Sequence, residues 1–134
     1  MIQPLLVFSN SAIFILRVVV GLVLMRHGLP KLKNIKGTGE WLQGVGFRPG
    51  NFWAVVAGLV EFVGGLALVL GFLTQLASVF IAVEFLVILV KFKKDKMFAG
   101  ESEIDWLILA AALILMTLGS GALSLERFLG LILY

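Results

Sequence analysis

The sequence predicts an all-α fold, an integral membrane four-helix bundle with a short interfacial helix in its first cytoplasmic loop. The first observation is composition: 60% of the 134 residues are hydrophobic and 14% are charged, whereas soluble domains are roughly half apolar and about a quarter charged. The second is that four segments run nearly free of polar residues. A chain this short cannot bury so much apolar surface within itself, so we expect lipid to cover it.

The four predicted spans cover residues 11–28, 52–70, 74–90 and 104–118, within a single domain over residues 1–134. A helix needs about 20 mostly apolar residues to cross a bilayer. Helices of a soluble bundle would show a polar face every 3.6 residues, which these segments lack. We expect the first span to end before Pro30. The second and third form one apolar run, which we expect to turn at Gly71 and Thr74-Gln75.

Lysine and arginine outside the spans gather in two loops. The first and third loops and their edges hold Arg26, Lys31, Lys33, Lys36, Arg48, Lys91, Lys93, Lys94 and Lys96. The positive-inside rule then places both long loops in the cytoplasm and both termini outside. In the first loop we expect a short helix to begin near Thr38. Its Trp41 would rest at the membrane interface, or the helix would fold back as a lid over the bundle.

Three ionisable residues lie inside the spans and away from their cytoplasmic ends: Arg17, Glu61 and Glu84. A charge in a span costs at least about 2.5–3.5 kcal/mol and usually has a partner, so we expect one buried cluster. In it, Arg17 pairs with Glu61, and Glu84 lies within reach. The pair would either fix helix register or form a functional site. Glu84, lacking a second arginine, would be a neutral acid bonded across helices or a proton-coupling group.

Small residues share the helical faces of these charges. Glu61 shares its face with Ala54, Ala57, Gly58, Gly64 and Gly65, and Arg17 shares its face with Gly21 and Gly28. Small residues let helices approach closely in lipid. We therefore expect the first two spans to cross tightly along these faces.

A second polar cluster is predicted at the cytoplasmic ends of the spans. His27 and Lys31 close the first span, and Glu103 and Asp105 open the fourth. Cations are favourable at a helix C-terminus and acids at a helix N-terminus, so interactions with the helix dipoles alone can account for both pairs of residues. The functional interpretation is a polar pocket at the membrane edge, in which His27 titrates near neutral pH.

Composition also disfavours several kinds of chemistry. The chain has no cysteine and one histidine, which excludes thiol exchange and a haem held by two of its own histidines. We expect no metal site, because zinc would have to be held by His27 and carboxylates alone. The net charge of +3 is too small and dispersed for a nucleic-acid-binding face. Redox chemistry would need a diffusible carrier such as a quinone, or a partner that carries the cofactor.

Five short motifs carry a resemblance to a known family. They are Leu16-Arg17 followed by Gly21, His27-Gly28-Leu29-Pro30-Lys31-Leu32, Gly58-Leu59-Val60-Glu61-Phe62-Val63-Gly64-Gly65, Gly71-Phe72-Leu73-Thr74, and Gly119-Ser120-Gly121-Ala122-Leu123-Ser124. In this order, over roughly residues 11–128, they resemble the DoxX family of small four-helix membrane proteins. The resemblance implies a multi-pass protein of the prokaryotic inner (cell) membrane. It also implies that Arg17, His27, Lys31 and Glu61 are functional positions.

Three functions stay open at this point. Some DoxX members are associated with quinone-linked oxidation or redox-stress complexes, so the resemblance implies a membrane subunit or accessory of such an oxidoreductase system. That subunit would bind a quinone between helices or anchor a soluble oxidoreductase partner by its cytoplasmic loops. The alternatives are a small proton-coupled transporter and a structural assembly protein without chemistry. Glycine-rich faces would also allow homo-oligomers within the bilayer.

Overall fold

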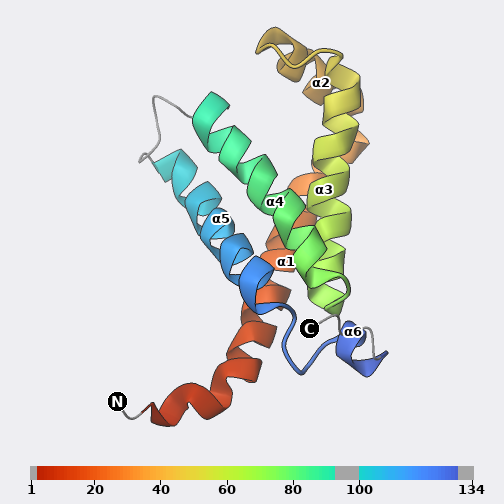
Figure 1. Ribbon diagram of the computed structural model, residues 1–134. Coiled ribbons are helices and arrows are strands. Elements are labelled where there is room, and N and C mark those ends of the chain that lie inside the picture. Colours follow the sequence, from red (N-terminus) through yellow and green to blue (C-terminus); the bar gives the residue numbers. More distant parts are fainter. Residues whose placement is uncertain (1–2, 93–99, 130–134) are drawn as a thin grey trace.

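The computed structural model describes residues 3–92 and 100–129, and within them every regular element is helical. The all-α prediction is confirmed (Figure 1). The elements in chain order are η1 (Pro4–Phe8), α1 (Ser9–Lys33), α2 (Ile35–Gly44), α3 (Gly50–Leu70), α4 (Thr74–Val87), the π-helical turn η2 (Ile88–Phe92), α5 (Gly100–Leu118) and α6 (Leu125–Phe128).

Helices α1 and α3 cross tightly on glycine. A Cβ added to Gly21 would lie 2.5 Å from the carbonyl oxygen of Gly65, and one added to Gly28 would lie 2.6 Å from the backbone nitrogen of Phe62. Such distances leave no room for any side chain, so the two backbones are in direct contact. The predicted small-residue crossing of the first two spans is confirmed.

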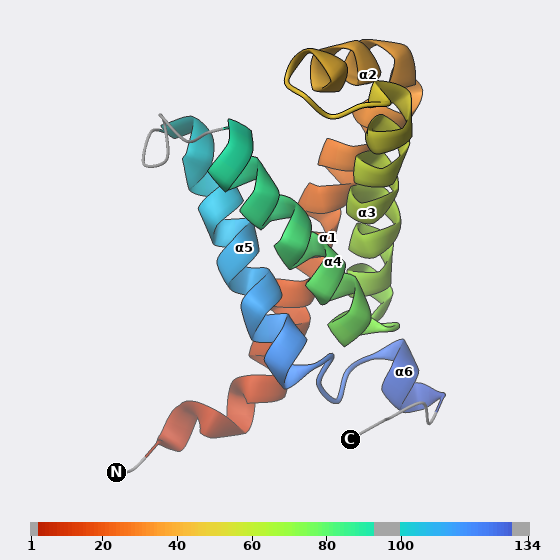
Figure 2. The same ribbon diagram turned by 45° about the horizontal axis from the view of Figure 1, so that its top comes forward.

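Helices α4 and α5 form a second pair. Their shared core contains Ile81, Phe85, Ala112 and Leu115, and it continues onto Leu24 of α1. The two pairs meet near the turn between α3 and α4 and diverge toward α2 (Figures 1 and 2). We call the first the hairpin end, where α6 also lies, and the second the α2 end.

The turn between α3 and α4 is where the sequence predicts it. Gly71 has a left-handed backbone with φ 72°, a conformation that glycine adopts without a steric penalty. The N–H of Phe72 donates to the carbonyl of Ala67 at 2.9 Å, which closes the last turn of α3. Helix α4 then begins at Thr74.

Three helical segments are long and apolar enough to cross a membrane within the described residues. They are Pro4–Lys33, Gly50–Leu70 and Thr74–Lys91, and each contains one of the first three predicted spans in full. The predicted span 104–118 lies within α5, whose first turns carry Glu103 and Asp105. That α5 also crosses the bilayer stays a prediction, as does the side of the membrane on which each end lies.

The predicted end of the first span is wrong. Helix α1 continues through Pro30 to Lys33. A proline within a helix removes one backbone donor, and here the tight contact of Gly28 with α3 holds the turn before it. Helix α2 begins at Ile35 and not near Thr38, because the Asn34 side chain accepts a hydrogen bond from the N–H of Gly37 at 3.1 Å and caps the helix.

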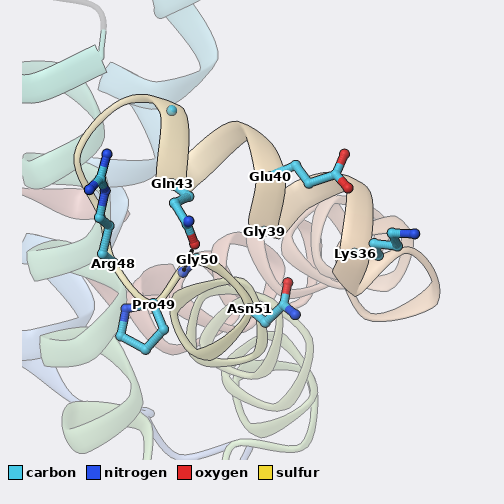
Figure 3. A pocket seen from close by; sticks show the side chains of 9 residues that line it. Lys36, Gly39, Glu40, Gln43, Arg48, Pro49, Gly50 and Asn51 are labelled. Carbon is cyan, nitrogen blue, oxygen red and sulfur yellow. Dashed lines mark hydrogen bonds between the residues drawn. The ribbon is translucent and has the colours of Figure 1, made fainter.

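Helix α2 folds back onto the start of α3. Leu42 is buried in this contact, whereas Trp41 is half-exposed. The side chain of Gln43 accepts a hydrogen bond from the N–H of Gly50 at 3.3 Å, joining α2 to the first turn of α3 (Figure 3). The predicted loop helix therefore exists and is packed on the bundle. Its position at a membrane interface stays a prediction.

Adjacent glycines of α3 provide a test of the crossing. We expect Gly65→Ala to lower the free energy of unfolding by about 1–3 kcal/mol, the usual cost of overpacking a filled contact, because its Cβ would lie 2.6 Å from the rigid carbonyl of Gly21. The matched control is Gly64→Ala, whose Cβ would lie 3.3 Å from the movable end of Ile81. Unfolding in detergent measures both. Equal effects of the two substitutions would contradict the crossing.

Candidate functional site

The guanidinium of Arg17 is buried, and each of its nitrogens donates a hydrogen bond to a backbone carbonyl oxygen. Its Nε donates to the carbonyl of Leu68 at 2.6 Å, Nη1 donates to that of Ser120 at 2.5 Å, and Nη2 donates to that of Leu123 at 2.7 Å. The arginine is 1% exposed. Leu68 lies in the last turn of α3, where carbonyls lack partners within the helix and favour a cation. Arg17 therefore joins α1, the end of α3 and the chain after α5.

The chain after α5 is held by further side chains at the hairpin end. The amide oxygen of Asn10 accepts a hydrogen bond from the N–H of Ala122 at 3.2 Å. The hydroxyl of Ser124 donates to the carbonyl of Gly121 at 3.1 Å and accepts from the hydroxyl of Ser120 at 3.0 Å. These contacts give the motif at residues 119–124 a structural role.

The predicted pairing of Arg17 with Glu61 is wrong. Gly28 of α1 lies against Glu61, and Gly21 lies against Gly65, so Arg17 is level with Gly71. Glu61 is seven positions before Leu68, roughly 10 Å along the helix at 1.5 Å per residue. The prediction compared depths counted from the predicted span ends, whereas the contacts of Gly21 and Gly28 with α3 set a register that places Arg17 nearer the hairpin end.

Glu61 is paired with Lys31 instead. The Lys31 ammonium donates to Glu61 Oε1 at 2.5 Å. The glutamate side chain is 1% exposed, whereas the lysine side chain is 29% exposed. Lys31 lies in the last turn of α1, beyond Pro30, and it reaches Glu61 only because the helix continues to that point. The pair thus links the α2 end of α1 to the middle of α3.

A groove opens between the two helix pairs toward the α2 end. Its volume is about 1320 Å³, and its walls are mostly apolar and aromatic. The lining residues come from α1, α2 and the loop that follows it, α3, α4, η2 and α5: His27, Lys31, Asn34, Gly37, Thr38, Trp41, Leu42, Phe47, Trp53, Val56, Ala57, Val60, Glu61, Phe80, Val83, Glu84, Phe85, Val87, Ile88, Lys91, Ile104 and Asp105.

Carboxylate oxygens in this groove lack hydrogen-bond partners. Oε2 of Glu61 and both Oε atoms of Glu84 are buried, and none of the three has a hydrogen-bond partner among the described residues. Most buried polar atoms in proteins are satisfied, and the interior of a bilayer has no water to satisfy the rest. Unsatisfied carboxyl groups on a groove wall can bind a ligand through hydrogen bonds.

The groove brings together most of both predicted clusters. Glu61, Glu84, His27, Lys31 and Asp105 line it. The side chain of Glu103 is exposed and is absent from its lining. Arg17 is also absent, and it belongs to the hairpin end. Of the basic loop residues, Lys93, Lys94 and Lys96 lie outside the described residues.

Sequence reasoning missed the aromatic walls of the groove. Trp41 and Phe47 come from α2 and the loop that follows it, Trp53 from α3, and Phe80 and Phe85 from α4. Phe47 and Trp53 pack edge to face with ring centroids 6.0 Å apart. Aromatic residues near predicted span ends were the available signal, but the same residues also suit a membrane interface.

A second, smaller hollow lies between α2 and the start of α3 (Figure 3). It has a volume of about 510 Å³, and Lys36, Glu40 and Arg48 are among its lining residues. These charges are exposed and of mixed sign. The described residues contain no group of three side chains able to hold a metal ion. The groove, with its buried carboxylates, is therefore the candidate site.

Comparisons with known proteins show the family of the chain. A family model described as DoxX matches residues 12–94. The chain belongs to the DoxX family. A protein of Bacillus subtilis (strain 168) named "Putative oxidoreductase CatD" is 30% identical over 114 residues, covering 85% of this chain and 84% of the relative. The DoxX match contains Arg17, His27, Lys31, Glu61 and Glu84. No solved structure matches the chain.

Substitution of Arg17 tests its structural role. We expect Arg17→Lys to lower the free energy of unfolding by at least about 2 kcal/mol. One ammonium cannot reproduce the three hydrogen bonds of the planar guanidinium, so buried carbonyls would lose their donors. Hydrogen exchange should also quicken at residues 119–124. Glu61→Gln should leave that segment protected, because Arg17 does not bond Glu61. Faster exchange there in Glu61→Gln would contradict the separation of the two sites.

Proposed function

We propose that this DoxX protein is the membrane subunit of an oxidoreductase system and that its groove binds the headgroup of a quinone. One observation carries the proposal: a mostly apolar groove within the helix bundle holds a few buried polar side chains. Ligand sites in proteins have this composition, in which apolar walls provide affinity and a few polar groups fix orientation. The name of the Bacillus relative supports a redox role.

The residues of the groove fit a planar ring that carries oxygens at both ends. Trp53, Phe80 and Phe85 provide apolar and aromatic surface for the ring. Lys31 has three N–H donors, one of which is used by Glu61, so it can also donate to a ligand oxygen. Glu84 provides a buried carboxyl group. A bound quinone supplies two-electron chemistry, while these side chains position its ring.

A partner protein would complete the system. A soluble oxidoreductase with its own redox cofactor would dock at the α2 end, where the groove opens. Lys33, Lys36 and Arg48 are exposed in this region and would favour a partner with an acidic surface.

Blocking the groove tests quinone binding. Ala57 lines the groove, whereas Leu59 of the same helix is 45% exposed and lies outside it. We expect Ala57→Phe to reduce the quinone that co-purifies with the protein by about tenfold or more, which is about 1.4 kcal/mol of binding free energy. Leu59→Phe should retain the wild-type amount. Extraction and chromatography measure quinone per protein. An absence of quinone from the wild-type protein, together with no binding of added decylubiquinone, would refute the proposal.

The carboxyl of Glu84 favours a second candidate, a proton-coupled transporter. Ionisable groups within membrane segments often act in proton relays, and the carboxyl oxygens of Glu84 have no hydrogen-bond partner among the described residues. Liposomes that contain the protein and a pH-sensitive dye distinguish the two functions. For a redox subunit we expect tetraphenylphosphonium to drive no proton flux. A flux present in the wild-type protein and lost in Glu84→Gln would replace our proposal with the transporter.

A further inference from the structure

Two buried carboxyl groups of the groove lie beside a single ammonium group. Glu61 Oε1 accepts a hydrogen bond from Lys31 at 2.5 Å. The carboxyl of Glu84, on α4, interacts electrostatically with both of these groups, and its two oxygens have no hydrogen-bond partner among the described residues. One positive charge balances one carboxylate, so an ionised Glu84 would be a second negative charge without a cation of its own.

The other titratable residues of the lining do not supply that cation. His27 and Lys91 also line the groove, but both are exposed. Asp105 of α5 is a further acid and adds no positive charge. A buried and uncompensated carboxylate is so unfavourable that the group takes up a proton instead. The polar cluster is therefore neutral as a whole when Lys31 and Glu61 are ionised and Glu84 holds a proton.

A protonated carboxyl differs from a carboxylate in what it offers a ligand. Its O–H is a hydrogen-bond donor, whereas a carboxylate only accepts. The ring carbonyls of a quinone also only accept, and no water reaches the interior of a bilayer to bridge two acceptors. Phe80 and Phe85 of the same helix line the groove beside Glu84. A ring packed on this wall can direct a carbonyl oxygen at the Glu84 hydroxyl.

We propose that Glu84 is a specificity-determining residue of the groove, which stays protonated and donates a hydrogen bond from its hydroxyl to a carbonyl oxygen of the bound quinone. The inference rests on the proposed function, since it assigns a role in binding the same ligand. Glu61 carries the negative charge and stays bonded to Lys31. The proton remains on Glu84 in the complex, so binding requires a ligand that carries a carbonyl and no charge.

Two substitutions at position 84 test donation, with the full chain in nanodiscs and decylubiquinone as the probe. We expect Glu84→Leu to weaken binding by about tenfold, because the carbonyl loses its donor. Glu84→Gln should restore the affinity to within about threefold of the wild type, because an amide N–H donates from a similar place. Glu103→Leu is the control, because Glu103 is an exposed acid outside the groove lining, and it should bind like the wild type.

Infrared difference spectroscopy observes the proton itself and does not depend on the folding of the leucine variant. A protonated carboxyl has a C=O stretching band that a carboxylate lacks. We expect such a band in the wild-type protein and in Glu103→Gln, and we expect it to be absent from Glu84→Gln. Decylubiquinone should shift the band, because the hydroxyl of Glu84 gains an acceptor. A band that is missing from the wild-type protein, or that decylubiquinone leaves unchanged or abolishes, would overturn the inference.

The binding outcomes separate this inference from the function on which it rests. Wild-type affinity in Glu84→Leu, or a loss in Glu84→Gln as large as that in Glu84→Leu, overturns the role of Glu84 as a donor and leaves the proposed function in place. Tighter binding in Glu84→Gln than in the wild type shows an ionised Glu84 and overturns it as well. An absence of decylubiquinone binding to the wild-type protein overturns the proposed function itself.

Discussion

The guanidinium of Arg17 joins segments that are far apart in the sequence, and the shape of the bundle depends on that junction. It donates hydrogen bonds to the carbonyl of Leu68 at the end of α3 and to the carbonyls of Ser120 and Leu123 in the chain after α5. The glycine contacts hold α1 on α3 along their length, but the α4–α5 pair is tied to them most firmly at the hairpin end. The pairs can therefore diverge at the other end (Figure 2), and the groove opens there.

The bilayer explains which parts of this arrangement could be predicted from the sequence. Apolar length predicted the helices, and the glycine spacing predicted the crossing of α1 and α3, because both are local patterns with one solution in lipid. The partner of Arg17 is a different matter. It depended on helix register, which is set by the contacts of Gly21 and Gly28 with α3 and cannot be counted from the ends of the apolar segments. Backbone carbonyls, present at every residue, leave no sequence signal that marks them as partners of a buried arginine.

The candidate site could be predicted only in part, because the contacts between its residues also depend on how the helices pack. The sequence marks five residues as candidates because they are charged or titratable and lie in or near apolar segments. All five line the groove: Glu61, Glu84, His27, Lys31 and Asp105. Their pairing was not predictable, because the Lys31–Glu61 bond needs the last turn of α1 beyond the proline. The aromatic walls combine residues of α2, α3 and α4, which only the tertiary fold brings together.

The site around Arg17 and the groove differ in how their buried polar groups are hydrogen-bonded. At Arg17 the polar groups meet one another, as expected of a group whose role is to hold helices together. In the groove, the Lys31–Glu61 pair could serve the same purpose, but it leaves Glu84 unexplained. A leucine in place of Glu84 would pack against the apolar wall and would leave no buried polar atom at that position without a hydrogen bond. An acid kept there without a protein partner is better explained by a partner from outside the chain.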